Sequence, residues 1–180
     1  MTRKSFYLFL IAFFLSTSAT AQLKNFDVTA TFPLVVKDPS NLHGYRFAAG
    51  YHPPCLTWKN TQLYFDLGYG YWWVPDATIY SSIHIYTFAP ILRTYFHVGP
   101  MFSPFFEVSV GLTYLTKTNL VTQKLGMHFC FQDQVGLGVA FGKEQRLAVS
   151  LSGLHYSNAS LAAHNSGITV PVILNINYRF

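Results

Sequence analysis

The sequence predicts an all-β fold, an eight-stranded antiparallel transmembrane β-barrel, from three observations. Charged residues make up 11% of the chain and aromatic residues 18%, whereas a soluble domain carries about 25% charged residues. After residue 21, no apolar run approaches the roughly 20 residues that a membrane helix needs. Eight segments instead alternate apolar with small or polar residues, as strands do when one face meets lipid and the other lines a narrow lumen.

Residues 1–21 have the features of a secretory signal peptide. Arg3 and Lys4 give a basic start, residues 6–15 are apolar, and residues 19–21 supply small residues for cleavage. The apolar run is too short to span a bilayer as a helix, although a retained N-terminal anchor is the alternative. We therefore expect an exported protein whose barrel domain covers residues 22–180.

The eight predicted strands follow this segment in order. They are residues 25–36, 44–52, 61–73, 83–97, 104–115, 124–141, 146–157 and 168–180. The apolar faces expected to meet lipid begin, in the same order, at Phe26, Tyr45, Leu63, Tyr86, Phe106, Leu125, Leu147 and Val170. The third segment alternates most clearly and the fourth least clearly. A soluble sandwich or lipocalin-like barrel is disfavoured, because the Gly-, Ser- and Thr-rich faces would then form its exterior.

The connections between these segments alternate in length. The tighter ones are residues 52–60, 98–103 and 142–145, which we expect on the periplasmic side with the N-terminus. The outer loops are then residues 37–43, 74–82, 116–123 and 158–167. They are short for an adhesion barrel with a protruding surface. The final residue, Phe180, is the aromatic C-terminus typical of bacterial outer-membrane barrels.

Composition also limits the ligands of this chain. The 12 Lys and Arg residues against 7 Asp and Glu give a mildly basic chain, but no basic stripe indicates nucleic-acid binding. No group of His, Asp and Glu has metal-ligand spacing, so we expect neither a metal nor a cofactor. Cys55 and Cys130 fall at different heights of the predicted barrel, and we expect no disulfide between them.

The stretch from Leu147 to Asn158 carries the clearest sign of chemistry. Because side chains alternate along a strand, His155 and Ser157 share the apolar face of the seventh segment, at its outer end. An imidazole two residues from a hydroxyl can act as general base and nucleophile toward a lipid. The alternative is an incidental polar pair at the membrane interface.

The wider sequence resembles the PagL family, the outer-membrane lipid A 3-O-deacylases. The resemblance covers most of the chain after the signal peptide, and its most specific part is the run from His155 to Ala159, HYSNA. It also includes Leu63–Trp72, His84, Phe88–Pro90, Pro104–Glu107 and Phe131–Gly136. The resemblance implies ester hydrolysis in the outer leaflet of the bacterial outer membrane, with lipid A or lipopolysaccharide as the substrate.

The family's site residues can be placed on this chain by the same motif. The resemblance implies that Ser157 is the nucleophile, that His155 is the general base and later the acid, and that Asn158 donates a hydrogen bond to the oxyanion. For Asn158 the alternative is to cap the turn after the strand. His84 matches a family position, and an interfacial role is the alternative for it.

The chain departs from the family at its third catalytic group. The family has a Glu at the start of the last strand, but residues 164–170 contain no acid. Pairing Phe141 with Leu147 in the preceding hairpin would place Asp133 opposite His155, where it could orient the imidazole unless a bulge turns it inward. Asn165, Ser166 or Thr169 are the other groups that could accept the imidazole N–H.

The sequence therefore predicts a serine-esterase-type hydrolase that removes the 3-O-linked 3-hydroxyacyl chain of lipid A. The alternative is a weakened or inactive barrel of the same family with a structural or lipid-binding role. The sequence leaves open whether the barrel forms a homodimer.

Overall fold

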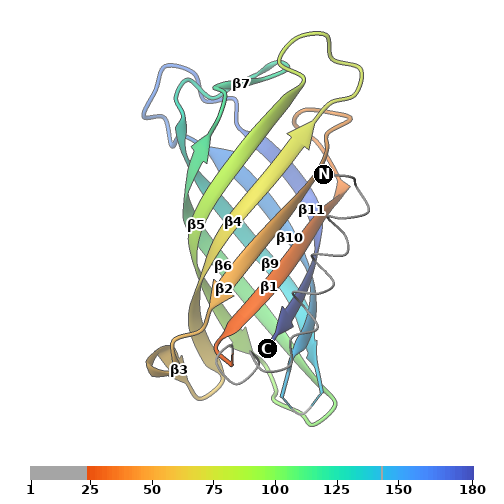
Figure 1. Cartoon of the computed structure of the whole chain (residues 1–180), viewed down its shortest axis with the longest axis vertical. Coiled ribbons are helices and arrows are strands. Elements are labelled where there is room, and N and C mark those ends of the chain that lie inside the picture. Colours follow the sequence, from red (N-terminus) through yellow and green to blue (C-terminus); the bar gives the residue numbers. More distant parts are fainter. Residues whose placement is uncertain (1–23, 143) are drawn as a thin grey trace, which may run out of the picture.

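Eight long antiparallel strands close into a barrel in the computed structural model, which describes residues 24–142 and 144–180 (Figure 1). The strands are β1 (Phe26–Val35), β2 (His43–Tyr51), β4 (Thr61–Trp73), β5 (Ser82–Tyr95), β6 (Phe102–Leu115), β9 (Phe129–Phe141), β10 (Leu147–Ser157) and β11 (Ile168–Arg179). Each pairs with its neighbours, and the β2–β4 and β1–β11 pairings complete the circle. This confirms the predicted fold class. The predicted signal peptide lies outside the described residues.

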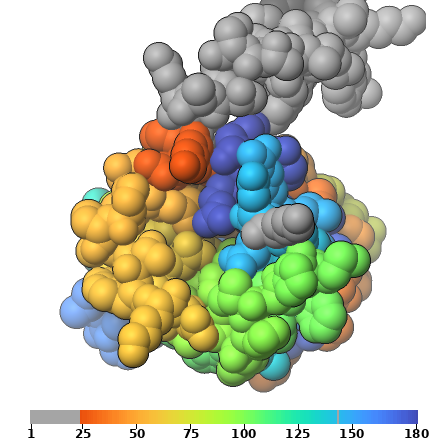
Figure 2. Space-filling model, turned by 90° about the horizontal axis from the view of Figure 1, so that it is seen from below, coloured from red at the N-terminus to blue at the C-terminus, as the bar shows by residue number. Residues whose placement is uncertain are grey.

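Short elements mark the two ends of the barrel. At one end, which we call the β7 end, β7 (Asn119–Leu120) and β8 (Gln123–Lys124) form a small hairpin in the connection from β6 to β9 (Figure 1). At the opposite end, the β3 end, the 3-10 helix η2 (Pro54–Leu56) leads into β3 (Thr57–Trp58). Figure 2 views the β3 end from below, with the start of β1 beside the end of β11.

Exposure alternates along the strands as the sequence pattern predicts. In β6 the outward side chains from Phe106 to Tyr114 are exposed apolar residues, while those between them, such as Glu107 and Thr113, are buried. Exposed Leu, Val, Phe and Tyr side chains continue around the outside on the other long strands. The outer wall is therefore apolar and the buried wall is largely polar or small, as in a barrel surrounded by lipid. Among the described residues, no helix is long and apolar enough to cross a membrane.

Apolar side chains fill the lumen toward both ends. At the β7 end a cluster that we call the outer plug combines strand residues with loop residues: Leu42, Trp72, Val74, Ile83, Ile85, Leu115, Leu120, Leu125, Cys130, Leu154, Tyr156, Ile168, Val170 and Ile173. A smaller cluster near the β3 end contains Tyr95, Phe105, Ala140 and Ala148. In the described part of the barrel, side chains therefore fill the lumen at these two levels, while a cavity of about 1000 Å³ lies at the β3 end beside His52 and Gln62.

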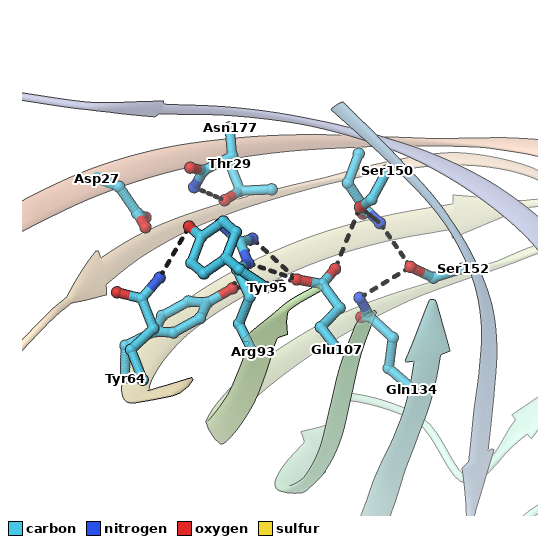
Figure 3. A network of polar contacts seen from close by, with 12 residues as sticks. Asp27, Thr29, Tyr64, Arg93, Tyr95, Glu107, Gln134, Ser150, Ser152 and Asn177 are labelled. Carbon is cyan, nitrogen blue, oxygen red and sulfur yellow. Dashed lines mark hydrogen bonds and ion pairs between the residues drawn. The ribbon is translucent and has the colours of Figure 1, made fainter. Parts of the chain in front are cut away.

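Between these clusters the lumen holds buried ion pairs, one of which is shown in Figure 3. Arg93 Nη2 lies 2.8 Å from Glu107 Oε2, and the other oxygen of Glu107 accepts a hydrogen bond of 3.1 Å from Ser150 on β10. Asn175 on β11 donates to both Ser150 and Ser152. Further pairs join Arg46 to Asp66 and His52 to Asp27. The contacts of Ser150 and Ser152 with Glu107 and Asn175 tie β10 from the inside to β6 and β11.

The structure corrects two predicted positions. The strand predicted over residues 124–141 begins at Phe129, and Leu125 is completely buried in the outer plug instead of facing lipid. On β11, Val170 is also completely buried, because the pairing with β10 slips by one residue between Val170 and Ile173. This β-bulge reverses which residues face outward at the start of the strand.

Candidate active site

The β7 end of β10 carries the predicted base and nucleophile. His155 and Ser157 face outward and are half-buried, whereas their neighbours Leu154 and Tyr156 are buried in the outer plug, with 2% and 0% exposure. Tight packing of these neighbours fixes the strand that presents the two polar groups. No hydrogen bond joins His155 to Ser157 here, and such bonds are often long in the absence of substrate.

The hairpin of β9 and β10 has the predicted register. Phe141 pairs with Leu147, which places Asp133 opposite His155 and Phe131 opposite Ser157. Asp133 is exposed on the outward face, so no bulge turns it inward. Its carboxylate forms no hydrogen bond or ion pair within the described residues. Asp133 therefore lies opposite the imidazole without a hydrogen bond to it.

The contact to the imidazole comes instead from β11. His155 Nδ1 lies 2.9 Å from Thr169 Oγ1, and the two residues are paired across β10 and β11. Without the bulge, Thr169 would share the inward face of Ile173 and Asn175. The bulge contains Pro171, which has no N–H to give to a regular ladder, and it turns the Thr169 hydroxyl outward.

An apolar groove runs beside His155 along the outer wall. Its volume is about 340 Å³, and it crosses β6, β9, β10 and β11. The outward residues that line it are Val108, Val110, Asp133, Val135, Gly153, His155, Thr169 and Pro171. Gly153 leaves the groove open, because a Cβ atom at this position would meet only the Pro171 carbonyl oxygen, at 3.5 Å. The groove can hold an alkyl chain that lies against the barrel, with its polar end at His155.

Asn158 has a structural position in the loop after β10. Its side chain is fully buried, and Nδ2 donates hydrogen bonds of 2.6 and 2.8 Å to the carbonyl oxygens of Leu125 and His164. Both amide hydrogens are therefore in use, and none is free for an oxyanion. The Asn158 side chain therefore holds the turn after β10 in place, which is the alternative role that the sequence allows.

The turn that follows Ser157 has an uncommon backbone. Ala159 and Ser160 have φ values of 51° and 63°, and Leu161 N donates to the Asn158 carbonyl oxygen at 3.0 Å. Two successive left-handed residues closed by this bond form a tight turn that usually contains glycine or asparagine. Within the described residues, the N–H groups of Ala159 and Ser160 donate no hydrogen bond.

Gly167 lies against the Cε1 side of the imidazole. A Cβ atom on this residue would come within 2.7 Å of His155 Cε1, and its φ of +70° also favours glycine. The absence of a side chain therefore makes room for the ring. Sequence reasoning missed this residue, although a glycine just before the last strand could have indicated it.

The other candidate groups lie apart from this site. His84 is on the outward face of β5, with Nδ1 2.8 Å from the Tyr69 hydroxyl, which is an interfacial aromatic environment. Cys55, in η2 at the β3 end, and Cys130, buried on β9, are both free thiols. In residues 24–142 and 144–180, no three His, Cys, Asp or Glu side chains gather closely enough to hold a metal ion.

The fold and the site together define a class of protein: an outer-membrane β-barrel with a serine and a histidine on its lipid-facing wall. The sequence profile described as "Lipid A 3-O-deacylase (PagL)" matches residues 43–179. The chain belongs to this family. The match includes the HYSN run, Asp133, which lies opposite His155 in the β-sheet, and the whole of β11.

Individual relatives agree with this membership. The lipid A deacylase PagL of Pseudomonas aeruginosa is 35% identical over 105 residues, which is 58% of each chain, so the match spans less than two thirds of that relative's length. The lipid A deacylase PagL of Bordetella bronchiseptica is 28% identical over 145 residues, covering 77% of this chain and 78% of the relative.

Solved structures show the same barrel. The crystal structure of the outer membrane enzyme PagL superposes with a TM-score of 0.68 and 26% identity, over 86% of this chain and 99% of that one. Neisserial surface protein A superposes with a TM-score of 0.54 over 87% of this chain and 97% of its own, but at 12% identity it shares only the fold.

Proposed function

We propose that this chain is a serine-type lipid A deacylase that releases the 3-O-linked 3-hydroxyacyl chain in the outer leaflet. The observation that carries the proposal is the outward placement of His155 and Ser157 beside an apolar groove. A soluble substrate would call for a site in a cleft open to water. A membrane lipid approaches from the side, where this site lies.

The groove suits the acyl part of such a substrate. Val108, Val110, Val135 and Pro171 offer apolar contacts along the wall, and the chain that lies there brings its ester to His155 and Ser157. Asp133 lines the same groove with a carboxylate, which accepts hydrogen bonds only. We assign Asp133 to the hydroxyl of the 3-hydroxyacyl chain, a donor that an unsubstituted chain lacks.

The reaction then follows the serine-hydrolase pattern. His155 Nε2 takes the proton of Ser157 as the hydroxyl oxygen attacks the ester carbonyl, and the resulting imidazolium returns a proton to the departing 3-oxygen of the glucosamine. Water, activated by His155, then hydrolyses the acyl-serine to the free 3-hydroxy acid. The N–H groups of Ala159 and Ser160 are the donors that we assign to the oxyanion, because the Asn158 amide is already bonded.

Mass spectrometry of lipid A tests this function. Purified lipopolysaccharide is incubated with the wild-type protein, with Ser157→Ala and with His155→Ala in detergent micelles. We expect the wild type to remove one 3-hydroxyacyl mass and to release the matching acid, and both variants to lose this activity. An unchanged wild-type spectrum would instead favour a barrel that binds lipid without cleaving it, since the group bonded to His155 Nδ1 is a neutral hydroxyl.

A further inference from the structure

The group that orients His155 is a neutral hydroxyl. Thr169 Oγ1 is the described atom that bonds His155 Nδ1, at 2.9 Å. Of the other groups weighed from the sequence, Asn165 uses its Oδ1 to accept from the Asn158 N–H, at 2.8 Å. Asp133 lies opposite His155 on β9, but within the described residues its carboxylate forms no hydrogen bond to the ring. Within the described residues, the imidazole thus has one side-chain hydrogen bond, and its partner comes from the last strand.

The backbone of Thr169 is held from both sides. On one side it pairs with His155, and on the other it forms a bridge with Asp38. In that bridge Asp38 N donates to the Thr169 carbonyl at 3.2 Å, and Thr169 N donates to the Asp38 carbonyl at 2.9 Å. Threonine is also stiff at χ1 because it is branched at Cβ. The hydroxyl is therefore presented to the imidazole from a fixed position.

The Cε1 side of the ring, between the two nitrogens, is also confined. Gly167 lies close enough to His155 Cε1 that a methyl group there would clash with it. Glycine at position 167 therefore leaves room for the ring in the position in which Nδ1 meets Thr169. A bond from Nδ1–H to Oγ1 leaves the lone pair on Nε2, which is the form that a general base needs.

We propose that Thr169 is the positioning residue of this site and that it works without a carboxylate. The proposal rests on the proposed function for its kinetic part. A hydroxyl differs from a carboxylate in two respects: it can also donate to Nδ1, and it brings no negative charge to stabilise the imidazolium. The geometry therefore favours the correct tautomer less strongly than a carboxylate would, and replacing Thr169 by Glu should accelerate the reaction.

The test combines a spectroscopic readout with kinetics. Nitrogen NMR of ¹⁵N-histidine-labelled protein in micelles reports which ring nitrogen of His155 carries the proton, and His155→Gln assigns the signal. We expect Nδ1–H in the wild type and in Thr169→Ser, and a shift toward Nε2–H in Thr169→Val. Thr94→Val is the matched control, because Thr94 is also half-buried and outward and bonds another side chain, Thr61, near the β3 end.

Kinetics of acid release complete the test. We expect Thr169→Val to lower kcat at least about 10-fold with little change in KM, toward the roughly 10⁴-fold loss that follows when a serine hydrolase loses its orienting acid. Thr169→Ser should retain most of the activity, Thr94→Val all of it, and Thr169→Glu should exceed the wild type.

The two proposals fail in different ways. If the wild type releases acid and Thr169→Val matches it in both kcat and tautomer, Thr169 has no positioning role. If the wild type releases no acid, the deacylase function fails, but the NMR result still decides whether Thr169 sets the His155 tautomer. Activity in Thr169→Glu alone would show that the site needs a carboxylate and that the hydroxyl does not replace it.

Discussion

Filling the groove at Gly153 should lower the rate of deacylation without lowering the free energy of unfolding. Replacing Gly153 by Leu puts four carbon atoms into a space of about 340 Å³ beside His155. The backbone can accept the change, since the new Cβ would meet only the Pro171 carbonyl oxygen at an ordinary contact distance of 3.5 Å. The groove rather than the barrel is therefore perturbed.

The expected loss of kcat/KM in Gly153→Leu depends on the surroundings that the acyl chain leaves when it enters the groove. An acyl chain that leaves the bilayer for the groove gains little from the hydrophobic effect, because both surroundings are apolar. Gly153→Leu instead displaces the ester of the bound acyl chain from its correct position beside His155 and Ser157. A displacement of about 1 Å at a reacting centre lowers the rate about 10²-fold, which corresponds to about 2.7 kcal/mol of transition-state stabilisation. We expect a loss of this size in kcat/KM.

The free energy of unfolding of Gly153→Leu should rise or remain unchanged. Glycine in a strand is less favourable than alanine by roughly 0.5–1 kcal/mol, and the new side chain faces lipid. The assay measures release of 3-hydroxy acids of several lengths, together with urea unfolding in micelles. Val149→Leu, on the same face of β10 but outside the groove, is the control and should behave as the wild type. Wild-type kcat/KM in Gly153→Leu would refute the assignment of the acyl chain to this groove.

Three further changes test other parts of the site and its support. Gly167→Ala should lower kcat by displacing the imidazole, since its Cβ would come within 2.7 Å of His155 Cε1, and full activity would contradict this packing. Arg93→Ala leaves Glu107 without its buried partner and should lower the free energy of unfolding by about 3–5 kcal/mol, measured with urea, while the rate per folded molecule stays close to wild type. Asp133→Asn should reduce the preference for 3-hydroxylated over unsubstituted acyl chains roughly 10-fold, in a competition assay read by mass spectrometry. Equal discrimination in both proteins would remove Asp133 from substrate recognition.

The sequence predicted the parts of the site that depend on alternation and on a short turn. His155 and Ser157 lie on the outward face because β10 is regular around them. The tight connection from Phe141 to Leu147 fixes the register with β9, so Asp133 lies where it was expected. Both features are local, and a period-two pattern is sufficient to find them.

The missed features depend on contacts between distant segments. Thr169 faces outward because of a bulge, and Pro171 inside a predicted strand was the available signal for it. Leu125 has the apolar character of a lipid-facing residue but is buried in the outer plug, and alternation does not distinguish these two environments. Asn158 was open to two interpretations until its partners at Leu125 and His164 were known.

The filled interior has a consequence for the cell that carries this protein. Aliphatic and aromatic side chains form the outer plug at the β7 end and a smaller cluster toward the β3 end, and paired charges such as Arg93 and Glu107 lie between them. A small solute that enters from the β3 end would therefore meet paired charges and then the outer plug, and both oppose its passage through the described part of the barrel.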